Sequence, residues 1–555
     1  MTGRDSTSEW RKTIRVYKQL EPSPLPPQGI EQVRVLVVGG GLVGLSMALD
    51  LAQKGHKVLV VSKLDFIPDG SKAICFSKRS LDIWHRLGVG ERMVAKGVVW
   101  NVGKVFAGDA EDPLYHFDML PVKGQKMPGF INLQQYYAEE FLIEALADEP
   151  NVELRWGHEV TAVNQRDGHV EVAVSTETGD YRIDAEWVIA CDGNRSPIRQ
   201  MLGLDFEGRV FEDNFLIADV KFKEERPSER WFWFDPPFNK GGSALLHKQP
   251  DDVWRLDFQL GWDVDREAAM KPENVEPYVR GMIGEDVEFA KEWYSVYTFQ
   301  CRRMKQFVHD RVVFAGDSAH LVSPFGARGC NGGLQDVDNL GWKLDFVLRG
   351  KAGAELIDSY NYEAIVTADE NILNSTRSTD FITPKSAVSR AFRDAVLELA
   401  ADHAFARPFV NSGRLSTAVS FPQSPLNTPD EEAWVAGIAP GSPVLDAPLG
   451  GGWLLEQLGG DFVLIRNGGM AEAEGARLLD VAGEATAAER CGLPHGAAML
   501  VRPDDFYEAL IAAHHGLDDA ASMKLNARLV MVLANQVGDM DLLMQAIELA
   551  RSGQD

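Results

Sequence analysis

Apolar and polar residues follow one another in the first part of the chain in an order that predicts an α/β fold. Val33–Val38 has the composition of a buried strand. After three glycines, the apolar stretch Leu42–Lys54 is expected to be a helix that Gly55 ends. Lys57–Val61 is a second apolar strand. Together these segments predict a β-α-β unit of about 30 residues, which is typical of a Rossmann-like domain.

A different pattern fills residues 205–300, where apolar and aromatic residues alternate with polar ones and predict an antiparallel sheet. Along Trp254–Leu260 the alternation predicts an apolar face and a polar face, with Trp254, Leu256, Phe258 and Leu260 on the first and Arg255, Asp257 and Gln259 on the second. Further along, Asp310–Ala315 is expected to be a short strand and Leu334–Leu348 a helix with one apolar side.

These patterns divide the chain into several domains, because 555 residues exceed what one hydrophobic core usually serves. We expect a Pro-rich arm (1–31) and an α/β domain in two parts (32–204 and 301–420), with a sheet domain (205–300) inserted between the parts. A Pro-rich linker (421–452) and a C-terminal domain (453–555) follow. In the last domain Phe462–Arg466 and Ala498–Arg502 resemble strands, and Met523–Leu549 resembles a helical end.

Composition and charge then exclude several classes of protein. With 45% hydrophobic and 25% charged residues, the chain has the composition of a soluble globular protein. The formal charge of −26 disfavours binding to nucleic acid and to anionic membranes. The chain has no apolar run of about 18 residues and no secretory signal, so we expect a cytoplasmic protein. The five cysteines are far apart, without a CxxC pair, and predict neither disulfides nor a metal site.

The first chemical motif lies between the predicted strand and helix. Gly39, Gly41 and Gly44, with Leu42 and Val43 between the last two, have the GxGxxG spacing of a dinucleotide fingerprint. Gly39 would make the tight turn, Gly41 would leave the backbone bare beside a pyrophosphate, and Gly44 would let helix and strand pack closely. The start of the helix would then face the negative charge of the dinucleotide.

Ser62 and Lys63 follow the second strand, where a fingerprint of this kind usually has an acidic residue for a ribose diol. A hydroxyl and a cation there would suit the 2′-phosphate of NADP. Alternatively, Ser62 only caps the strand and points into solvent. The position therefore leaves the identity of the dinucleotide open.

Two motifs later in the chain help to identify the dinucleotide. Asp192-Gly193 follows an apolar strand, and Gly316-Asp317 precedes Pro324 and a glycine-rich segment, Gly326–Gly333. The three motifs in this order resemble the single-component FAD-dependent aromatic hydroxylases, the relatives of para-hydroxybenzoate, phenol and 3-(3-hydroxyphenyl)propionate hydroxylases. The resemblance covers roughly residues 33–370. It implies a Rossmann-like FAD-binding domain with an antiparallel-sheet substrate domain.

The resemblance implies that many residues contact a noncovalently bound FAD. Asp317 would bind its hydroxyls, Pro324 would pack beside the flavin ring, and the backbone of the glycine-rich segment would approach that ring. The implied FAD-binding residues outside the fingerprint and the Ser62-Lys63 pair are Lys72, Arg79, Gln135, Val160, Asp192, Gly193, Asp317, Pro324, Gly329, Cys330 and Asn331.

Alternatives remain open at several of these positions. Arg79 could equally be a solvated helix residue, and Gln134 competes with Gln135 for the role near the flavin. The family usually has an arginine where Ser71-Lys72-Ala73 stands in this chain.

The reaction implied by the resemblance is hydroxylation of a phenolic or other electron-rich aromatic ring. NAD(P)H would dock transiently to reduce FAD, and O2 would then form a flavin C4a-hydroperoxide that transfers the hydroxyl group. A base or a cation near the substrate hydroxyl would favour the phenolate. The candidates for catalytic roles are His247, Arg255, Tyr297 and Pro324, although aromatic-rich strands also build ordinary cores.

Two other functions compete with hydroxylation. A flavin-dependent halogenase would carry GWxWxIP, which Arg230–Pro236 matches only in part. A non-catalytic flavoprotein scaffold is the second alternative. The Pro-rich linker followed by Leu500–Asp504 also resembles the thioredoxin-like C-terminal domain of the phenol hydroxylases. Cys491, the single cysteine of this segment, excludes an internal disulfide, so we expect no redox chemistry there. We expect a scaffold role instead, with the Met523–Leu549 helices at the subunit interface of a homo-oligomer, most simply a dimer.

Overall fold

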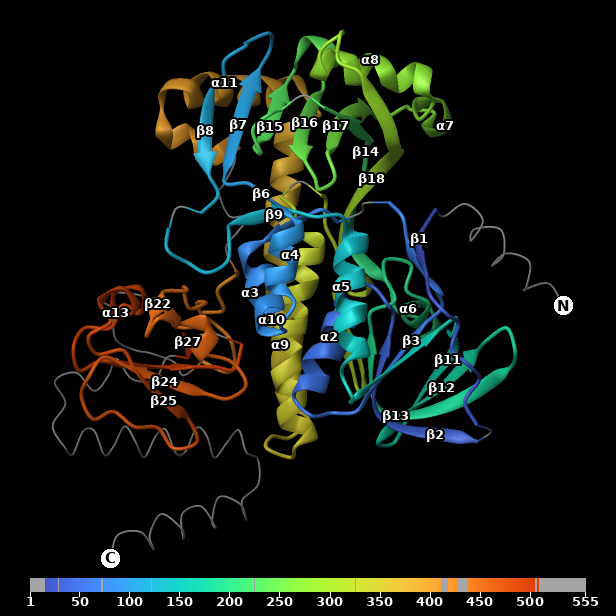
Figure 1. Ribbon diagram of the computed structural model, residues 1–555, viewed down its shortest axis with the longest axis vertical. Coiled ribbons are helices and arrows are strands. Elements are labelled where there is room, and N and C mark those ends of the chain that lie inside the picture. The colour runs from blue at the N-terminus through green and yellow to red at the C-terminus, as the bar shows by residue number, and fades with distance from the viewer. Residues whose placement is uncertain are drawn as a thin grey trace, which may run out of the picture. The chain divides into compact units, whose positions relative to one another are not determined.

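The computed structural model describes residues 15–27, 29–70, 73–120, 122–223, 225–324, 326–410, 418–427, 438–504 and 507–508 (Figure 1). The chain divides into two compact units. Unit 1 comprises Met1–Pro121, Met127–Gln335 and Ala368–Thr417, and unit 2 comprises Val122–Lys126, Asp336–Thr367 and Ala418–Asp555. Lys72 and the helical end predicted at Met523–Leu549 lie outside the described residues.

The first sheet of unit 1 contains the predicted β-α-β unit. Its strands follow the order β10-β3-β2-β13-β12-β11, and β20 pairs with β13 and with β19. The strands are β2 (Ile30–Val38), β3 (Val58–Ser62), β10 (Val152–Trp156), β11 (Glu159–Arg166), β12 (His169–Ser175), β13 (Asp180–Ala190), β19 (Val308–His309) and β20 (Val312–Phe314). The strands β10, β3, β2, β13 and β20 run parallel, as a Rossmann-like sheet requires.

The second sheet of unit 1 is the predicted antiparallel sheet, with the order β21-β18-β14-β17-β16-β15-β7-β8. Its strands are β7 (Val102–Ala107), β8 (Tyr115–Asp118), β14 (Phe206–Phe222), β15 (Arg230–Phe234), β16 (Ser243–Lys248), β17 (Val253–Gly261), β18 (Phe289–Met304) and β21 (His320–Leu321). Two of them, β7 and β8, come from well before the predicted range 205–300. The pairing of β7 with β15 is parallel and joins distant segments, so local alternation could not show it.

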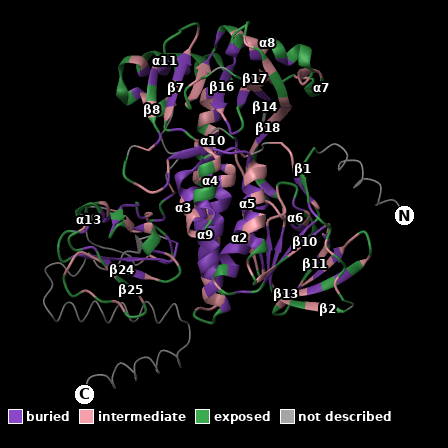
Figure 2. Cartoon of the chain, viewed as in Figure 1, coloured by how far each residue is buried: buried purple, intermediate pink, exposed green. Residues whose placement is uncertain are grey.

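The two faces of β17 differ as the sequence predicts. Trp254, Leu256, Phe258 and Leu260 belong to a hydrophobic core that packs against α8 (Pro272–Ile283). The opposite face of the sheet carries polar residues and a second apolar cluster, to which α10 (Leu356–Ile382) and α11 (Ala387–Asp402) contribute Ile382 and Leu397. Figure 2 shows the buried strands of both sheets in purple.

Helices and short strands complete unit 1. The helices are α2 (Leu42–Gln53), α3 (Lys78–Arg86), α4 (Gly90–Lys96), α5 (Gln135–Ala147), α6 (Pro197–Met201), α7 (Arg266–Ala269) and α12 (Arg407–Val410). The short strands are β1 (Val16–Gln19), β4 (Phe66–Pro68), β5 (Cys75–Ser77), β6 (Val98–Val99) and β9 (Phe130–Asn132). The predicted arm thus contains β1, which pairs with β4. The helix α9 (Gly329–Leu348) begins five residues before the predicted start at Leu334.

Unit 2 contains a small mixed sheet in the order β25-β24-β26-β27. The strands of this sheet are β24 (Val463–Arg466), β25 (Arg477–Asp480), β26 (Ala498–Val501) and β27 (Tyr507–Glu508). Unit 2 also contains the two-stranded pair β22 (Pro448–Leu449) and β23 (Gly452–Trp453) and the helix α13 (Ala485–Cys491). The pair β24–β25 is parallel, while β26 is antiparallel to both of its neighbours. In the part of the chain that the structure describes, no helix has the length and apolarity that crossing a membrane would need.

Candidate active site

The glycine-rich turn that joins β2 to α2 packs closely against neighbouring backbone. Gly39 has a φ of +121°, a backbone conformation that favours glycine, and a Cβ there would collide with the carbonyl of Cys191. A Cβ at Gly44 would collide with the carbonyl of Gly39. At Gly41, by contrast, the nearest neighbour of an added Cβ is Glu139 Oε1 at 4.0 Å. The turn is therefore tightly packed on the protein side and open at the start of α2.

Three motifs that are far apart in the sequence meet at Val43. A Cβ added to Gly316 would lie 2.9 Å from Val43 Cγ2, and one added to Gly333 would lie 2.6 Å from the same atom. The fingerprint helix, the Gly316-Asp317 motif and the start of α9 are thus in direct contact. A cofactor bound at the first motif would reach the other two.

Ser62 ends β3 and faces the glycine turn. Its side chain is buried, and its Oγ accepts a hydrogen bond from the N–H of Leu64 at 3.3 Å. A Cβ on Gly40 would lie 3.0 Å from Ser62 Oγ and 2.5 Å from Trp156. Ser62 therefore caps the strand end but does not point into solvent, whereas Lys63 is exposed.

The start of α5 distinguishes Gln135 from Gln134. Gln135 Oε1 accepts from the N–H of Ala73 at 3.1 Å, and its Nε2 donates to Glu139 Oε1 at 2.8 Å. Gln134 instead donates to the carbonyl of Pro250 at 3.2 Å. Since Glu139 lies beside Gly41, Gln135 is the glutamine on the side of the glycine turn. Glu139 was missed by the sequence analysis, although its spacing of four residues from Gln135 on a helix places the two side chains together.

The Asp192-Gly193 motif is tied to the Gly316-Asp317 motif. Arg199 donates to the carbonyl of Ser318 at 2.8 Å, and Ser318 Oγ donates to the carbonyl of Ala190 at 2.6 Å. Asp192 Oδ2 accepts from the N–H of Ile198 at 3.0 Å, while its Oδ1 is buried and has no hydrogen-bond partner among the described residues. Burial raises the pKa of Asp192. The unpartnered oxygen is therefore available to a ligand hydroxyl.

Asn331 holds the glycine-rich segment in place. Its Oδ1 accepts from the N–H of Ser77 at 3.0 Å and from Ser80 Oγ at 2.6 Å, and its Nδ2 donates to the carbonyls of Cys75 and Ala327. The side chain is thus fully used by contacts within the protein. Any contact of Asn331 with FAD would have to come from its backbone.

Other residues implied by the resemblance are placed as follows. Asp317 and Pro324 are exposed, and Gly329 begins α9. Burial raises the pKa of the Cys330 thiol, and the negative charges of Asp317 and Glu139 raise it further. Arg79 is buried in α3, so the alternative of a solvated residue is wrong. Val160 is buried in β11, opposite Val174 of β12.

The polar face of the antiparallel sheet carries a row of side chains on neighbouring strands. Arg230 of β15 pairs in register with His247 of β16, His247 with Arg255 of β17, and Arg255 with Asp219 of β14. Arg255 and Asp219 form a buried bidentate ion pair, with distances of 2.8 and 3.0 Å. We call Arg230, His247, Arg255 and Asp219, together with the adjacent Asp257, the polar row.

Three atoms of the polar row are buried and have no hydrogen-bond partner among the described residues: Arg230 Nη1, His247 Nε2 and Asp257 Oδ1. His247 Nε2 lies 3.6 Å from Asp257 Oδ2, too far for a hydrogen bond. Burial lowers the pKa of His247, so the ring is neutral at pH 7. Because orphaned buried polar atoms are costly, these three atoms indicate a place for a polar ligand.

Cys75 connects the polar row to the glycine-rich segment. Its Sγ lies 3.8 Å from His247 Nδ1 and donates to Asn132 Oδ1 at 3.1 Å, and its carbonyl accepts from Asn331. A proton on His247 Nδ1, facing the sulfur, would leave Nε2 with a free lone pair. Neither Cys75 nor Arg230 was singled out by the sequence analysis, since only the fold brings β5 against β16.

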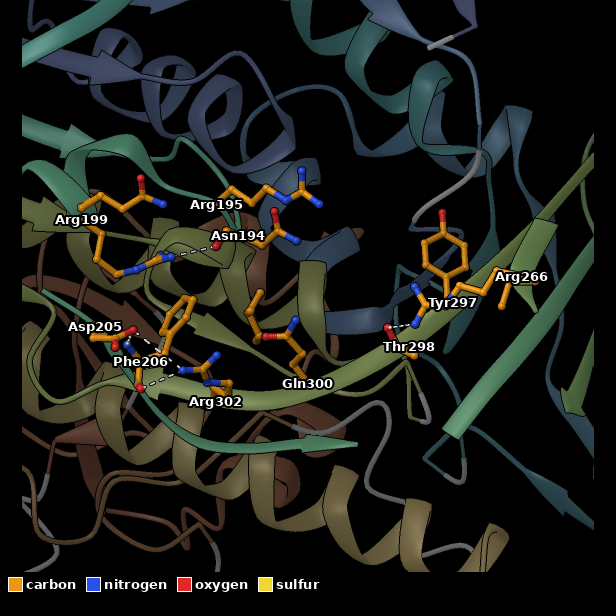
Figure 3. A pocket seen from close by; sticks show the side chains of 13 residues that line it. Asn194, Arg195, Arg199, Asp205, Phe206, Arg266, Tyr297, Thr298, Gln300 and Arg302 are labelled. Atoms are coloured by element: carbon orange, nitrogen blue, oxygen red, sulfur yellow. Dashed lines mark hydrogen bonds and ion pairs between the residues drawn. The ribbon is translucent and has the colours of Figure 1, made fainter. Parts of the chain in front are cut away.

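Tyr297 lies on the same sheet but lines a separate pocket of about 400 Å³ (Figure 3). Burial raises the pKa of Tyr297, so its phenol stays protonated. Four arginines from three parts of the chain share this pocket, namely Arg195, Arg199, Arg266 and Arg302. Asp205 is the one acidic residue among the described residues that line it.

The glycine turn, the uncapped start of α2 and the open face at Gly41 define a dinucleotide-binding protein of the Rossmann type. The family model described as FAD binding domain matches residues 32–375, well over half of the chain, and the chain therefore belongs to this family. The predicted FAD cofactor is confirmed by this match. A second model, described as a protein of unknown function (DUF2783), matches residues 497–552.

Individual relatives agree with this family. The chain is 28% identical over 386 residues to a 3-(3-hydroxy-phenyl)propionate/3-hydroxycinnamic acid hydroxylase from Escherichia coli (strain SMS-3-5 / SECEC), covering 67% of this chain and 66% of that protein. The chain thus spans just under two thirds of the length of the curated relatives it matches. The resemblance to the FAD-dependent aromatic hydroxylases stated above is confirmed.

Solved structures share the fold. The flavin-dependent monooxygenase PieE, in complex with FAD and substrate, is 22% identical with a TM-score of 0.74, covering 92% of this chain and 100% of that chain. Aklavinone-11 hydroxylase, in a ternary complex with FAD and aklavinone, is 21% identical with a TM-score of 0.73, covering 92% and 99%. At these identities the similarity concerns the fold.

Proposed function

We propose that this protein is an FAD-dependent monooxygenase that uses NAD(P)H and O2 to hydroxylate a phenolic substrate bound against the polar row. The observation that carries the proposal is the group of three buried, unpartnered polar atoms at Arg230, His247 and Asp257. They lie on a sheet face that Cys75 links to Asn331 in the glycine-rich segment. The related hydroxylase from E. coli is named for phenolic acids, which supports a phenolic substrate here.

The residues of the first sheet fit a bound FAD. Gly41 and the first turn of α2 would hold the pyrophosphate, Ser62 would lie at the ribose, and Asp192 Oδ1 would accept from a ligand hydroxyl. FAD would supply the oxygen-transfer chemistry. We propose noncovalent binding, since burial raises the pKa of Cys330 and keeps the nearby thiol protonated. Acid precipitation should leave the yellow colour in the supernatant; colour in the pellet would contradict this.

His247 acts as the proton acceptor in this proposal. Its Nε2 takes the proton of the substrate hydroxyl, and the carboxylate of Asp257, 3.6 Å away, stabilises the imidazolium that forms. Arg230 stabilises the anionic oxygen of the substrate. Arg255 is a positioning residue, because both of its bonds to Asp219 are already made. The ring is thereby presented as a phenolate, the more nucleophilic form.

The arginine-lined pocket is the proposed docking place of NAD(P)H. Arg195 and Arg199 come from the segment after Asp192, Arg266 from α7 and Arg302 from β18 (Figure 3). Guanidinium groups bind phosphate oxygens well, and four arginines around one pocket are notable in a chain of charge −26. Arg302→Gln should raise the KM for NAD(P)H about tenfold and leave the KM for the phenol unchanged. An unchanged NAD(P)H KM would remove this pocket from the proposal.

The decisive experiment follows NAD(P)H oxidation, oxygen uptake and product together. Holoenzyme is incubated with a panel of phenols that includes 3-(3-hydroxyphenyl)propionate, and products are identified by mass spectrometry. A hydroxylated product, with NAD(P)H oxidation stimulated by the phenol, is expected. A halogenated product in the presence of halide would establish the halogenase instead, and the absence of any stimulation would favour a scaffold.

The C-terminal segment 453–555 is proposed to be a thioredoxin-like domain without redox chemistry. The mixed sheet, with one parallel pair extended by antiparallel strands, supports the assignment. Burial raises the pKa of Cys491 to about 12, which makes its thiol unreactive. The full chain should therefore not reduce insulin with dithiothreitol, and a clear activity would contradict the assignment. The five unpaired cysteines support a cytoplasmic location.

A further inference from the structure

The segment Val122–Lys126 belongs to unit 2, although the parts of the chain before and after it belong to unit 1. It lies between β8 and β9, and we call it the β8–β9 loop. Its hydrogen-bond partners in unit 2 come 320 and 366 residues later in the chain. A short loop from the first part of the chain is therefore bound by the last part.

Two side chains of unit 2 bind the backbone of this loop. Arg490, in the last turn of α13, donates to the carbonyl of Gly124 at 2.7 Å and also to the carbonyls of Lys123 and Asp446. The buried carboxylate of Asp446 accepts from the N–H of Lys126 at 2.8 Å. One guanidinium group thus joins three carbonyls, which its several N–H donors allow.

These hydrogen bonds fix a loop that has little apolar packing of its own. Val122, Lys123 and Gly124 are exposed. Gly124 has a φ of +68°, and a Cβ added there would lie 3.4 Å from Arg490 Nη2. The position of the loop therefore depends strongly on Arg490.

Both ends of the loop lead to the polar row. Met119 before it and Phe130 after it are buried in the apolar cluster that also contains Cys75. Phe130 begins β9, which pairs with β5 so that Asn132 lies opposite Cys75. Asn132 Oδ1 accepts from Cys75 Sγ at 3.1 Å, and the same sulfur lies 3.8 Å from Nδ1 of His247. The loop is thus continuous with the strand that holds Cys75 beside His247.

We propose that Arg490 is a positioning residue of the substrate site. By binding the β8–β9 loop it fixes β9, and β9 fixes Asn132 and Cys75 beside His247. A shift of about 1 Å in a reacting group can lower a rate about a hundredfold, and an opened site admits water. Because it concerns the proposed substrate site, this role rests on the proposed function. It gives the C-terminal part of the chain a part in the reaction without any contact with the substrate.

Limited proteolysis of the full-length holoenzyme tests whether Arg490 holds the loop. Trypsin attacks the carbonyl of a lysine, and the carbonyl of Lys123 accepts from Arg490. Arg490→Met should therefore raise the rate of cleavage after Lys123 about tenfold or more, followed by mass spectrometry of the fragments. The matched control is Arg466→Met, since Arg466 bonds to Asp480 within the sheet of unit 2. Equal cleavage rates in the two variants would overturn the proposal.

Thiol labelling tests whether the effect reaches the polar row. Cys75 and Cys301 are both buried, and Cys301 lies in a different apolar cluster. In native holoenzyme treated with a maleimide, Arg490→Met should raise the labelling rate of Cys75 about tenfold and leave that of Cys301 unchanged. Arg490→Lys keeps a cation with fewer usable donors and should give intermediate rates. An unchanged rate at Cys75, or equal acceleration at both cysteines, would overturn the positioning role.

The kinetic consequence is a loss of coupling. In Arg490→Met the amount of hydroxylated product per NAD(P)H oxidised should fall about twofold or more, and the KM for the phenol should rise. The KM for NAD(P)H and the flavin spectrum should stay as in wild type, and Arg490→Lys should lie between the two. Wild-type coupling in a variant whose loop is cleaved faster would overturn the proposal. If wild type hydroxylates no phenol, the proposed function fails, and cleavage and labelling alone then decide whether Arg490 positions the polar row.

Discussion

Buried charges are arranged in opposite ways in the two units of the molecule. In unit 2, Lys343, Glu363, Arg502 and Asp504 are almost completely inaccessible and form a continuous network. Glu363 accepts from Lys343 at 2.6 Å and from Arg502 at 2.7 Å, and Arg502 also donates to both oxygens of Asp504. The two positive and two negative charges cancel.

The polar row of unit 1 is incomplete by comparison. Arg255 and Asp219 are paired, but Arg230 Nη1, His247 Nε2 and Asp257 Oδ1 have no partner among the described residues. A fully paired network stabilises one packed arrangement, whereas unpaired atoms cost stability. The comparison therefore supports a folding role for the network of unit 2 and the proposed ligand-binding role of the polar row.

The largest expected effect comes from breaking the network of unit 2. Glu363→Gln would leave Lys343 and Arg502 buried without their shared counter-ion and should lower the free energy of unfolding by about 3–5 kcal/mol. Urea unfolding measures the change. Glu489→Gln, at an exposed position of the same unit, should change it by less than about 0.5 kcal/mol. Similar effects of the two variants would mean that the network does not stabilise the fold.

The next effect concerns the base in the polar row. His247→Gln should lower kcat/KM for a phenol about a hundredfold, because the proton acceptor is lost, while the urea midpoint stays near wild type. His309→Gln, in β19 of the other sheet, is the control and should keep full activity. A variant at His247 that loses stability but not activity would place this residue with the structural network.

Removing the cation of Arg230 should separate substrate binding from stability. Arg230→Met takes away a guanidinium with an unpartnered buried nitrogen, so stability should stay constant or rise by up to about 1 kcal/mol. The KM for an anionic phenol should rise about tenfold. Steady-state kinetics and thermal unfolding on the same preparation check both. A loss of several kcal/mol would contradict a ligand-binding role.

The smallest effect is a difference in pH dependence. Burial lowers the pKa of His247 below its ordinary value of 6.5, so its contribution to stability is complete above pH 6.5 and is lost as the pH falls through the folded value. Although burial opposes ionisation of Glu363, Arg502 and Lys343 outweigh it and lower the pKa of Glu363 below 4.5. Its contribution is therefore lost only below pH 4.5.

Unfolding experiments between pH 7 and 5 can detect this difference. Wild type should lose stability relative to His247→Gln across that range, by at most about 1.4 kcal/mol per pH unit. Glu363→Gln should keep a constant offset from wild type over the same range. Parallel curves for wild type and His247→Gln would show that the histidine does not titrate there.

The features that could be predicted from the sequence depend on neighbours in the chain. Gly39 and Gly44 are required by a turn of a few residues, and the alternation of Trp254 to Leu260 sets the two faces of β17 locally. Glu139, Arg230 and Cys75 were not predicted. Glu139 lies beside Gly41 and Cys75 beside His247, and both neighbours are distant in the chain. The unpartnered nitrogen of Arg230 is apparent only once the side chains have been placed.

The sequence by itself determined the Rossmann-like turn, because the spacing of its glycines is a property of consecutive residues. Its three ordered motifs also carried the resemblance that implied the family and the FAD cofactor. Only the tertiary structure decided that Gln135 rather than Gln134 lies on the side of the glycine turn. It also decided that the Asn331 side chain makes all of its hydrogen bonds within the protein, and that β7 and β8 join the second sheet. It also decided which buried charges are paired. Pairing depends on distances between side chains from different strands and helices, and these distances exist only once the chain has folded.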